Sequence, residues 1–85
     1  MNEYKIMCEV SFPKFDKIMD VALPVNKTVF YVTQMLDRII NDEITKTYKP
    51  TGNELLIDKD SGKVYDKNVL IKDSEIKNGS KIVYY

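Results

Sequence analysis

The fold is decided where two apolar patterns meet, in the stretch Met19-Asp20-Val21-Ala22-Leu23-Pro24-Val25-Asn26-Lys27-Thr28-Val29. Up to Pro24, apolar residues at positions 19, 21 and 23 alternate, which is typical of a half-buried strand. Thr28 (or Asn26) is a suitable helix N-cap, because its side-chain oxygen can accept a hydrogen bond from a free backbone N–H. From Val29 the apolar residues gather on one helical face, at positions 29, 32, 36, 39 and 40. We therefore predict a strand followed by one amphipathic helix near residues 28–42.

Strand patterns lie on both sides of this junction. Residues 4–12 have apolar side chains at alternate positions, so they are expected to form an antiparallel hairpin with residues 19–23. After a loop around Pro50 and Gly52, we predict strands at residues 54–58, 63–65 and 80–85, with a helical turn at 71–76 and a tight turn at 78–79. The order is ββαβββ, an α+β class with one helix packed on a mixed sheet. The first and last strands should pair in parallel at its centre, because they are the most apolar and the helical crossover permits it.

Length and composition favour a single folded domain, residues 1–85. Hydrophobic residues make up 44% and charged residues 31%, as in globular rather than disordered proteins. The 13 basic and 13 acidic residues are interspersed, so no field of one sign is available for nucleic acid or an anionic membrane. No apolar run approaches the roughly 20 residues of a membrane helix, and we expect no signal peptide. The single cysteine, Cys8, suits a reducing compartment, so we expect a cytoplasmic protein.

The sequence offers little material for catalysis, metal binding or cofactor binding. It has no histidine, the side chain whose ordinary pKa lies nearest neutrality. Cys8 lies on the apolar face of the first strand, where a small core residue is the expected role. Asp58, Asp60 and Asp66 lack the EF-hand spacing, since the twelfth position counted from Asp58 is Val69 rather than glutamate. No phosphate-binding glycine loop is present, so we expect no enzyme activity, no metal and no cofactor.

Over essentially its full length the sequence resembles ubiquitin-like (β-grasp) proteins. The resemblance is carried by residues 23–29 and by Ile71-Lys72-Asp73-Ser74-Glu75-Ile76, which is similar to the family's Leu-x-Asp-x-x-Ile turn. Within this superfamily, Asp20-Val21-Ala22-Leu23-Pro24 and the Ile76-x-Asn78-Gly79 turn are similar to the YukD/EsaB proteins of Gram-positive bacteria. These are stand-alone ubiquitin-like proteins encoded with the type VII (Ess/Yuk) secretion machinery. The resemblance implies a cytoplasmic accessory or regulatory component, with partners among the membrane-associated machinery or its regulators.

One departure from the family pattern separates the alternatives. Ubiquitin and the sulfur carriers end in a flexible Gly-Gly whose carboxylate is adenylated and transferred, whereas this sequence ends Lys81-Ile82-Val83-Tyr84-Tyr85. We therefore expect a non-conjugating protein, and a sulfur carrier or modifier made as a precursor is the less favoured alternative. A generic ubiquitin-like adaptor unrelated to secretion is the main alternative.

The first candidate partner-binding surface is the open side of the sheet. Alternation within residues 54–58 predicts that Leu55 and Ile57 point inward, on the same side as Ile82 and Tyr84. The residues then expected on the open side are Met7, Leu56, Val83 and Tyr85. They should form one apolar surface for another protein or for a second copy of the chain. The alternative is that the aliphatic parts of lysine and glutamate side chains cover this surface.

The second candidate surface is on the helix. Phe30 and Tyr31 project away from the stripe formed by Val29, Val32 and Leu36. They are predicted to bind a partner, and the alternative is that the two rings pack on a loop, as single exposed apolar residues commonly do.

Overall fold

The computed structural model describes residues 4–85, which begin with a β-hairpin. β1 (Lys5–Phe12) and β2 (Lys17–Pro24) pair antiparallel, and one turn of 3-10 helix, η1 (Pro13–Phe15), joins them. The buried residues of β1 alternate as the sequence pattern predicts: Ile6, Cys8, Val10 and Phe12. The same pattern places Tyr4 on the core face, but its side chain is exposed because it precedes β1, beyond the last core residue of the strand.

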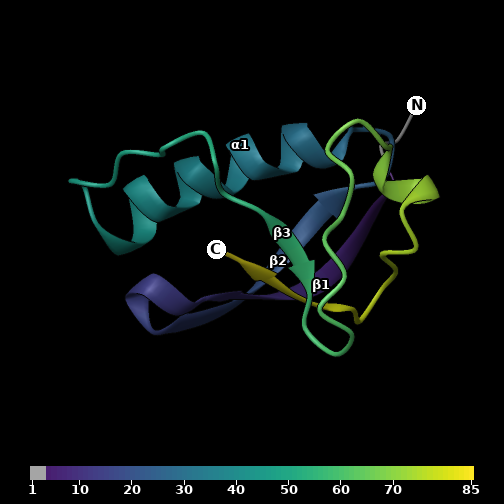
Figure 1. Cartoon of the computed structure of the whole chain (residues 1–85), viewed down its shortest axis with the longest axis horizontal. Coiled ribbons are helices and arrows are strands. Elements are labelled where there is room, and N and C mark those ends of the chain that lie inside the picture. The colour runs from purple at the N-terminus through teal and green to yellow at the C-terminus, as the bar shows by residue number, and fades with distance from the viewer. Residues whose placement is uncertain (1–3) are drawn as a thin grey trace.

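The helix α1 (Val29–Ile39) lies across one face of the sheet (Figure 1). Thr28 caps its N-terminus, since the Thr28 Oγ1 accepts a hydrogen bond of 3.1 Å from the Tyr31 N–H. α1 continues into a short π-helical segment, η2 (Ile40–Ile44), so the helix predicted near residues 28–42 is confirmed. Among residues 4–85, no helix has the length and apolar character needed to span a bilayer.

The sheet has four strands in the order β2-β1-β4-β3. β4 (Lys81–Tyr84) pairs in parallel with β1 and antiparallel with β3 (Leu56–Asp58), so the central pairing of the first and last strands is confirmed. The strand predicted at residues 63–65 is reduced to one β-bridge between Ile57 and Val64. Only Lys63 and Tyr65 form backbone hydrogen bonds with β3 before the chain leaves the sheet. The predicted helical turn is present as a 3-10 turn, η3 (Ile71–Asp73).

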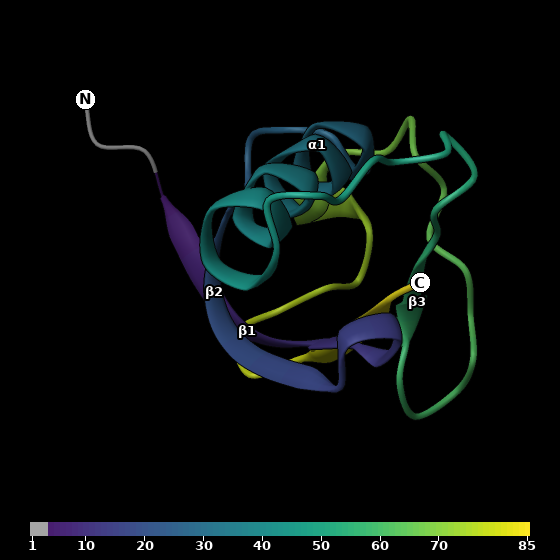
Figure 2. The same cartoon turned by 90° about the vertical axis from the view of Figure 1, so that its left-hand side faces the viewer.

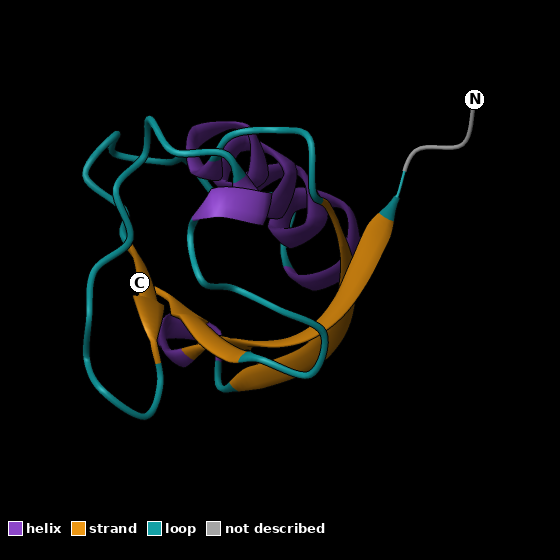
Figure 3. Ribbon diagram, turned by 90° about the vertical axis from the view of Figure 1, so that its right-hand side faces the viewer, coloured by secondary structure: helices purple, strands orange, loops and turns teal. Residues whose placement is uncertain are grey.

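Helix and sheet form two layers with the core between them (Figures 2 and 3). The largest fully buried side chains come from both layers and from η3: Phe12, Leu23, Leu36, Ile40, Leu56, Ile71 and Ile82. The α+β class with one helix on a mixed sheet is therefore confirmed. This arrangement also gives the sheet a covered inner face and an open outer face.

One prediction about the sheet is wrong, the phase of β3. Leu56 is 1% exposed, whereas Leu55 is 40% exposed. β3 pairs with β4 so that Leu56 lies opposite Tyr84 and Ile57 lies opposite Val83. Residues directly opposite in an antiparallel pair share a face, and Tyr84 is buried. Leu56 therefore belongs to the core, and Leu55 and Ile57 belong to the outer face.

Candidate functional site

The outer face of the sheet carries an apolar cluster over β3 and β4. Val83 and Ile57 lie side by side in the strand pairing, and both are half-buried. One step further, Leu55 and Tyr85 exchange two backbone hydrogen bonds of 2.9 and 3.0 Å, and the Tyr85 side chain is 55% exposed. We call these four residues, Leu55, Ile57, Val83 and Tyr85, the open-face cluster. No second layer of residues 4–85 packs over this side of the sheet (Figure 2).

The cluster extends along one row that crosses the whole sheet. Ser11 on β1 lies next to Val83 on one side and opposite Ile18 on the other. At the far end of the row, Val64 forms the bridge to Ile57. Ile18 and Val64 are both exposed, so apolar side chains continue to both ends of this row.

Met7 is exposed on the same face but does not join the cluster. Its side chain is 49% exposed. However, a row of charged residues crosses the sheet two residues further along β1. In that row Glu9 lies between Asp20 on β2 and Lys81 on β4. Met7 is four residues from Ser11, a separation of roughly 13 Å along the strand. The single surface predicted from Met7, Leu56, Val83 and Tyr85 is thus wrong in extent, because Leu56 is buried and Met7 lies apart.

A lysine lies at one edge of the cluster. The Lys14 ammonium from η1 lies 5.2 Å from the centre of the Tyr85 ring, within cation–π range. Glu54, which could have covered part of the open face, is buried, and its carboxylate is hydrogen-bonded to Thr51 and Gly52. The Tyr85 ring therefore remains accessible, with a positive charge beside it.

Phe30 and Tyr31 are both exposed, on two different flanks of α1. Phe30 borders a hollow of about 380 Å³ that also contains Asp37 and Glu54. Tyr31 packs under the Lys27 ammonium, which lies 5.1 Å from its ring centre. Consecutive helical residues diverge by about 100°, so the two rings do not form one surface with each other. Both rings lie on the helix side of the sheet, whereas the open-face cluster lies on the opposite side.

A polar network holds the loop that leads into β3. Tyr84 and Tyr48 both donate hydrogen bonds to the Asp37 Oδ1, at 2.6 and 2.9 Å. Burial raises the pKa of both tyrosines, and the Asp37 carboxylate raises it further. The buried Glu54 carboxylate accepts hydrogen bonds from Thr51 and Gly52. Sequence reasoning missed the hydrogen bonds to Asp37 because Tyr48 and Tyr84 lie 11 and 47 residues away from it in the chain.

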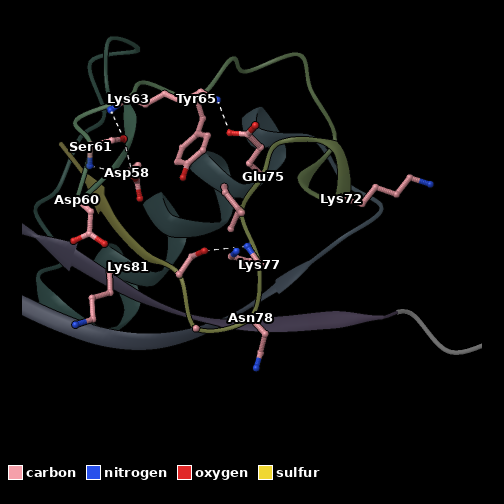
Figure 4. A pocket seen from close by; sticks show the side chains of 13 residues that line it. Asp58, Asp60, Ser61, Lys63, Tyr65, Lys72, Glu75, Lys77, Asn78 and Lys81 are labelled. Atoms are coloured by element: carbon pink, nitrogen blue, oxygen red, sulfur yellow. Dashed lines mark hydrogen bonds and ion pairs between the residues drawn. The ribbon is translucent and has the colours of Figure 1, made fainter.

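A second hollow, of about 830 Å³, lies at one end of the sheet between the turn of residues 58–65 and the segment 72–81 (Figure 4). The Lys63 ammonium and a Glu75 carboxylate oxygen bridge its two sides at 2.9 Å. Asp58 accepts hydrogen bonds from the Ser61 hydroxyl and N–H, and these lower the pKa of Asp58. Lysines and carboxylates alternate around the hollow, so it does not present the single sign of charge that a phosphate group requires.

The one thiol of the sequence is that of Cys8. Cys8 is buried, and burial raises the pKa of its thiol to about 11. A reactive cysteine needs the opposite shift, because the thiolate is the nucleophile. Within the described part of the chain, no three His, Cys, Asp or Glu side chains come together as a metal site would require.

Comparisons with known proteins find similarity in structure alone. No family model and no curated protein matches the chain. Among solved structures, the ubiquitin-like domain of an Arabidopsis thaliana protein has 23% identity and a TM-score of 0.69, covering 95% of this chain and 76% of that one. Caldiarchaeum subterraneum ubiquitin has 13% identity and a TM-score of 0.73, over 95% of this chain and 91% of that one.

A third similar structure is a much longer chain. It belongs to the MycP5-free ESX-5 inner membrane complex, with 15% identity and a TM-score of 0.78, and covers 95% of this chain but 20% of that one. Likeness at these identities shows the fold. The chain therefore has a ubiquitin-like, β-grasp fold.

Proposed function

We propose that the chain is a non-conjugating ubiquitin-like module that binds protein partners as a cytoplasmic accessory or regulatory component of a bacterial type VII (Ess/Yuk) secretion system. The assignment to secretion is supported by the resemblance of Asp20–Pro24 and of the Ile76-x-Asn78-Gly79 turn to the YukD/EsaB proteins. Its partners would be the membrane-associated machinery or its regulators.

The observation that carries the binding role is the open-face cluster. Two of its side chains, Leu55 and Tyr85, are exposed, and the half-buried Ile57 and Val83 are the neighbouring outward-facing pair of the same two segments. Removing apolar surface from water stabilises a complex by roughly 25 cal/mol per Å², before the cost of association is subtracted. Aromatic residues such as Tyr85 are also enriched where interfaces derive most of their binding energy. A partner that covers this cluster gains more than it would elsewhere on a surface of mixed charge.

The absence of catalysis in this proposal is supported by the side chains present. The sequence has no histidine, and the Cys8 thiol is buried with a raised pKa.

Secretion by a strain that carries single substitutions tests the proposal. We expect deletion of the gene to abolish export of the small WXG-type helical substrates and the wild-type copy to restore it. Ile57→Asp should fail to restore export, because it places a charge within the cluster. Met7→Asp is the matched control, since it adds the same charge on the same face outside the cluster. Normal export from the deletion strain would instead favour an adaptor unrelated to secretion.

A further inference from the structure

An apolar groove lies at the end of the sheet where β1 begins and β2 ends. Its volume is about 520 Å³, and its apolar lining comes from three segments of the chain: Tyr4, Ile6, Val25 and Ile76. The side chains of Ile6, Val25 and Ile76 are buried members of the core, so they form the floor of the groove. The Tyr4 side chain is 66% exposed and borders the groove. The groove therefore has room for a large apolar side chain of a ligand.

Hydrogen bonds from the backbone hold two sides of this groove. On one side, the Val25 N–H donates to the Tyr4 carbonyl at 3.1 Å, and the Lys72 N–H donates to the Val25 carbonyl at 3.0 Å. On the other side, the Met7 N–H donates to the Asn78 Oδ1 at 2.8 Å. Because these contacts are made within the chain itself, the groove exists before a ligand arrives, which lowers the ordering cost of binding.

The polar residues that line the groove carry no negative charge. They are Lys72, Lys77 and Asn78. Among residues 4–85 the ion pair within 4.0 Å joins Lys63 to Glu75, so neither lysine of the groove has a carboxylate partner in that part of the chain. The Asn78 Oδ1 already accepts a hydrogen bond, which leaves its NH2 group to donate.

The segment 72–78 separates the groove from the hollow of mixed charge described above. Figure 4 shows the Lys72 side chain extending away from that hollow. The groove thus combines an apolar floor with donors and positive charge at its border, although the whole chain has no net charge. A ligand that is complementary to it is apolar at one point and negatively charged beside that point.

We propose that this groove binds an acidic segment of a partner protein, with one large apolar side chain between two carboxylates. The apolar side chain contacts Tyr4 and the core residues of the floor, and a phenylalanine suits the exposed Tyr4 ring. The carboxylates lie beside Lys72 and Lys77, with the Asn78 NH2 group as an additional donor. Exposed ion pairs contribute little by themselves, so the apolar contact supplies most of the affinity and the lysines select the acidic partner.

This site is separate from the open-face cluster and does not rest on the proposed role in secretion. The row that contains the cluster crosses β1 at Ser11, whereas the groove contains Ile6. The two positions are five residues apart, a separation of roughly 17 Å along the strand. Ile6 also faces the core, on the side of the sheet opposite the cluster. The chain could therefore contact two partner segments at the same time.

The test uses the full chain and the capped synthetic peptide Gly-Ser-Asp-Phe-Glu-Ser-Gly, observed by NMR. We expect the peptide to shift the methyl signals of Ile6, Val25 and Ile76 and the side-chain NH2 signals of Asn78. The methyl signals of Ile57, in the open-face cluster, are the internal control and should not move. Replacing the phenylalanine of the peptide by alanine should weaken binding at least about tenfold. Replacing both acidic residues by their amides should weaken binding about tenfold.

Substitutions in the protein test the recognition of charge. The double variant Lys72→Glu/Lys77→Glu should reverse the preference, so that a peptide with lysine at both acidic positions binds about tenfold more tightly than the acidic peptide. Lys46→Glu/Lys49→Glu is the matched control, because it makes the same change of charge at exposed positions beyond the far end of α1 (Figure 1). Tyr4→Ala should weaken binding of the acidic peptide and leave the fold intact, since Tyr4 is exposed.

Several results would overturn the proposal. The first is no shift at the groove with millimolar peptide, and the second is equal binding of the acidic, amide and lysine peptides. Binding of decanoate as tightly as the acidic peptide would identify the ligand as a fatty acid instead. Groove signals that shift with protein concentration alone would make a second copy the occupant. Peptide binding only after removal of residues 1–3 would make the chain's own N-terminus the occupant. None of these results affects the open-face cluster, which is tested with Ile57→Asp.

Discussion

Leu56 lies directly opposite Tyr84 in the antiparallel pair of β3 and β4, and both side chains are buried beneath α1. This pairing fixes the phase of β3. It turns Leu55 and Ile57 to the outer face, where they meet Tyr85 and Val83. The apolar cluster on the open face therefore depends on a single register between two short strands.

The first prediction compares two adjacent leucines. Leu56→Ala should destabilise the fold by about 2–5 kcal/mol, because it leaves a cavity in the core. Leu55→Ala should change stability by less than about 0.5 kcal/mol, because Leu55 lies on the surface. Urea denaturation followed by circular dichroism measures both. If Leu55→Ala proved the more damaging of the two, β3 would have the opposite phase.

Much of this fold is predictable from the sequence because most elements have an unambiguous period. The alternation in β1 and β2 and the helical spacing from Val29 indicate which face of each is buried, and the structure agrees. Residues 54–58 lack such a signal, since three apolar residues follow one another between two carboxylates. Burial of Glu54 is also unexpected from its charge, and is made tolerable by hydrogen bonds from Thr51 and Gly52.

Sequence patterns could not predict the extent of the candidate surface, for a different reason. Alternation tells which face a residue occupies, but the neighbours across the sheet depend on the register. The row that contains Glu9 and Lys81 separates Met7 from Val83, although all four lie in segments with clear alternation. Long-range pairings of this kind are set by packing of the whole sheet rather than by local periodicity.

The second prediction concerns the two tyrosines that share Asp37. Tyr84→Phe should destabilise the fold by about 1.5–3 kcal/mol, because it removes a buried hydrogen bond to a carboxylate. Tyr48→Phe should cost less, since Tyr48 is only half-buried. The double variant should lose more free energy of unfolding than the two single variants added together, because each single variant still leaves Asp37 with one hydrogen-bond partner. Denaturation of the three variants measures this coupling. Strict additivity would show that the two hydrogen bonds act independently.

The third prediction is a pH dependence at Glu54. Burial acts to raise the pKa of this carboxyl, but hydrogen bonds from Thr51 and Gly52 outweigh it, so the pKa lies below its ordinary value of 4.5. A pKa lowered in the folded state adds stability above the unfolded pKa, and this stability is lost as the pH falls through the folded value. Glu54→Gln should therefore lower the melting temperature at neutral pH by about 4–8 °C for each kcal/mol lost.

The same substitution should have little effect in acid, where Glu54 is itself protonated. Thermal melts at neutral pH and well below the ordinary glutamate pKa of 4.5 measure this difference. Glu43→Gln, at an exposed position of η2, is the matched control and should change neither melt. If Glu54→Gln lowered the melting temperature by the same amount in acid, the effect would come from packing rather than from the charge of Glu54.

The most direct measurement, by calorimetry, is the affinity of the purified chain for the cytoplasmic part of an FtsK-like ATPase of a type VII secretion system, a member of the membrane-associated machinery that we propose as its partner. We expect wild-type protein to bind and Ile57→Asp and Tyr85→Asp to bind at least about 30-fold more weakly while keeping their fold, as for central interface residues. Met7→Asp, the matched control outside the cluster, should bind within about threefold of wild type. Full-strength binding by folded Ile57→Asp would contradict the assignment of the open face and point instead to Phe30 and Tyr31, and no binding by the wild-type chain would contradict the proposed partner.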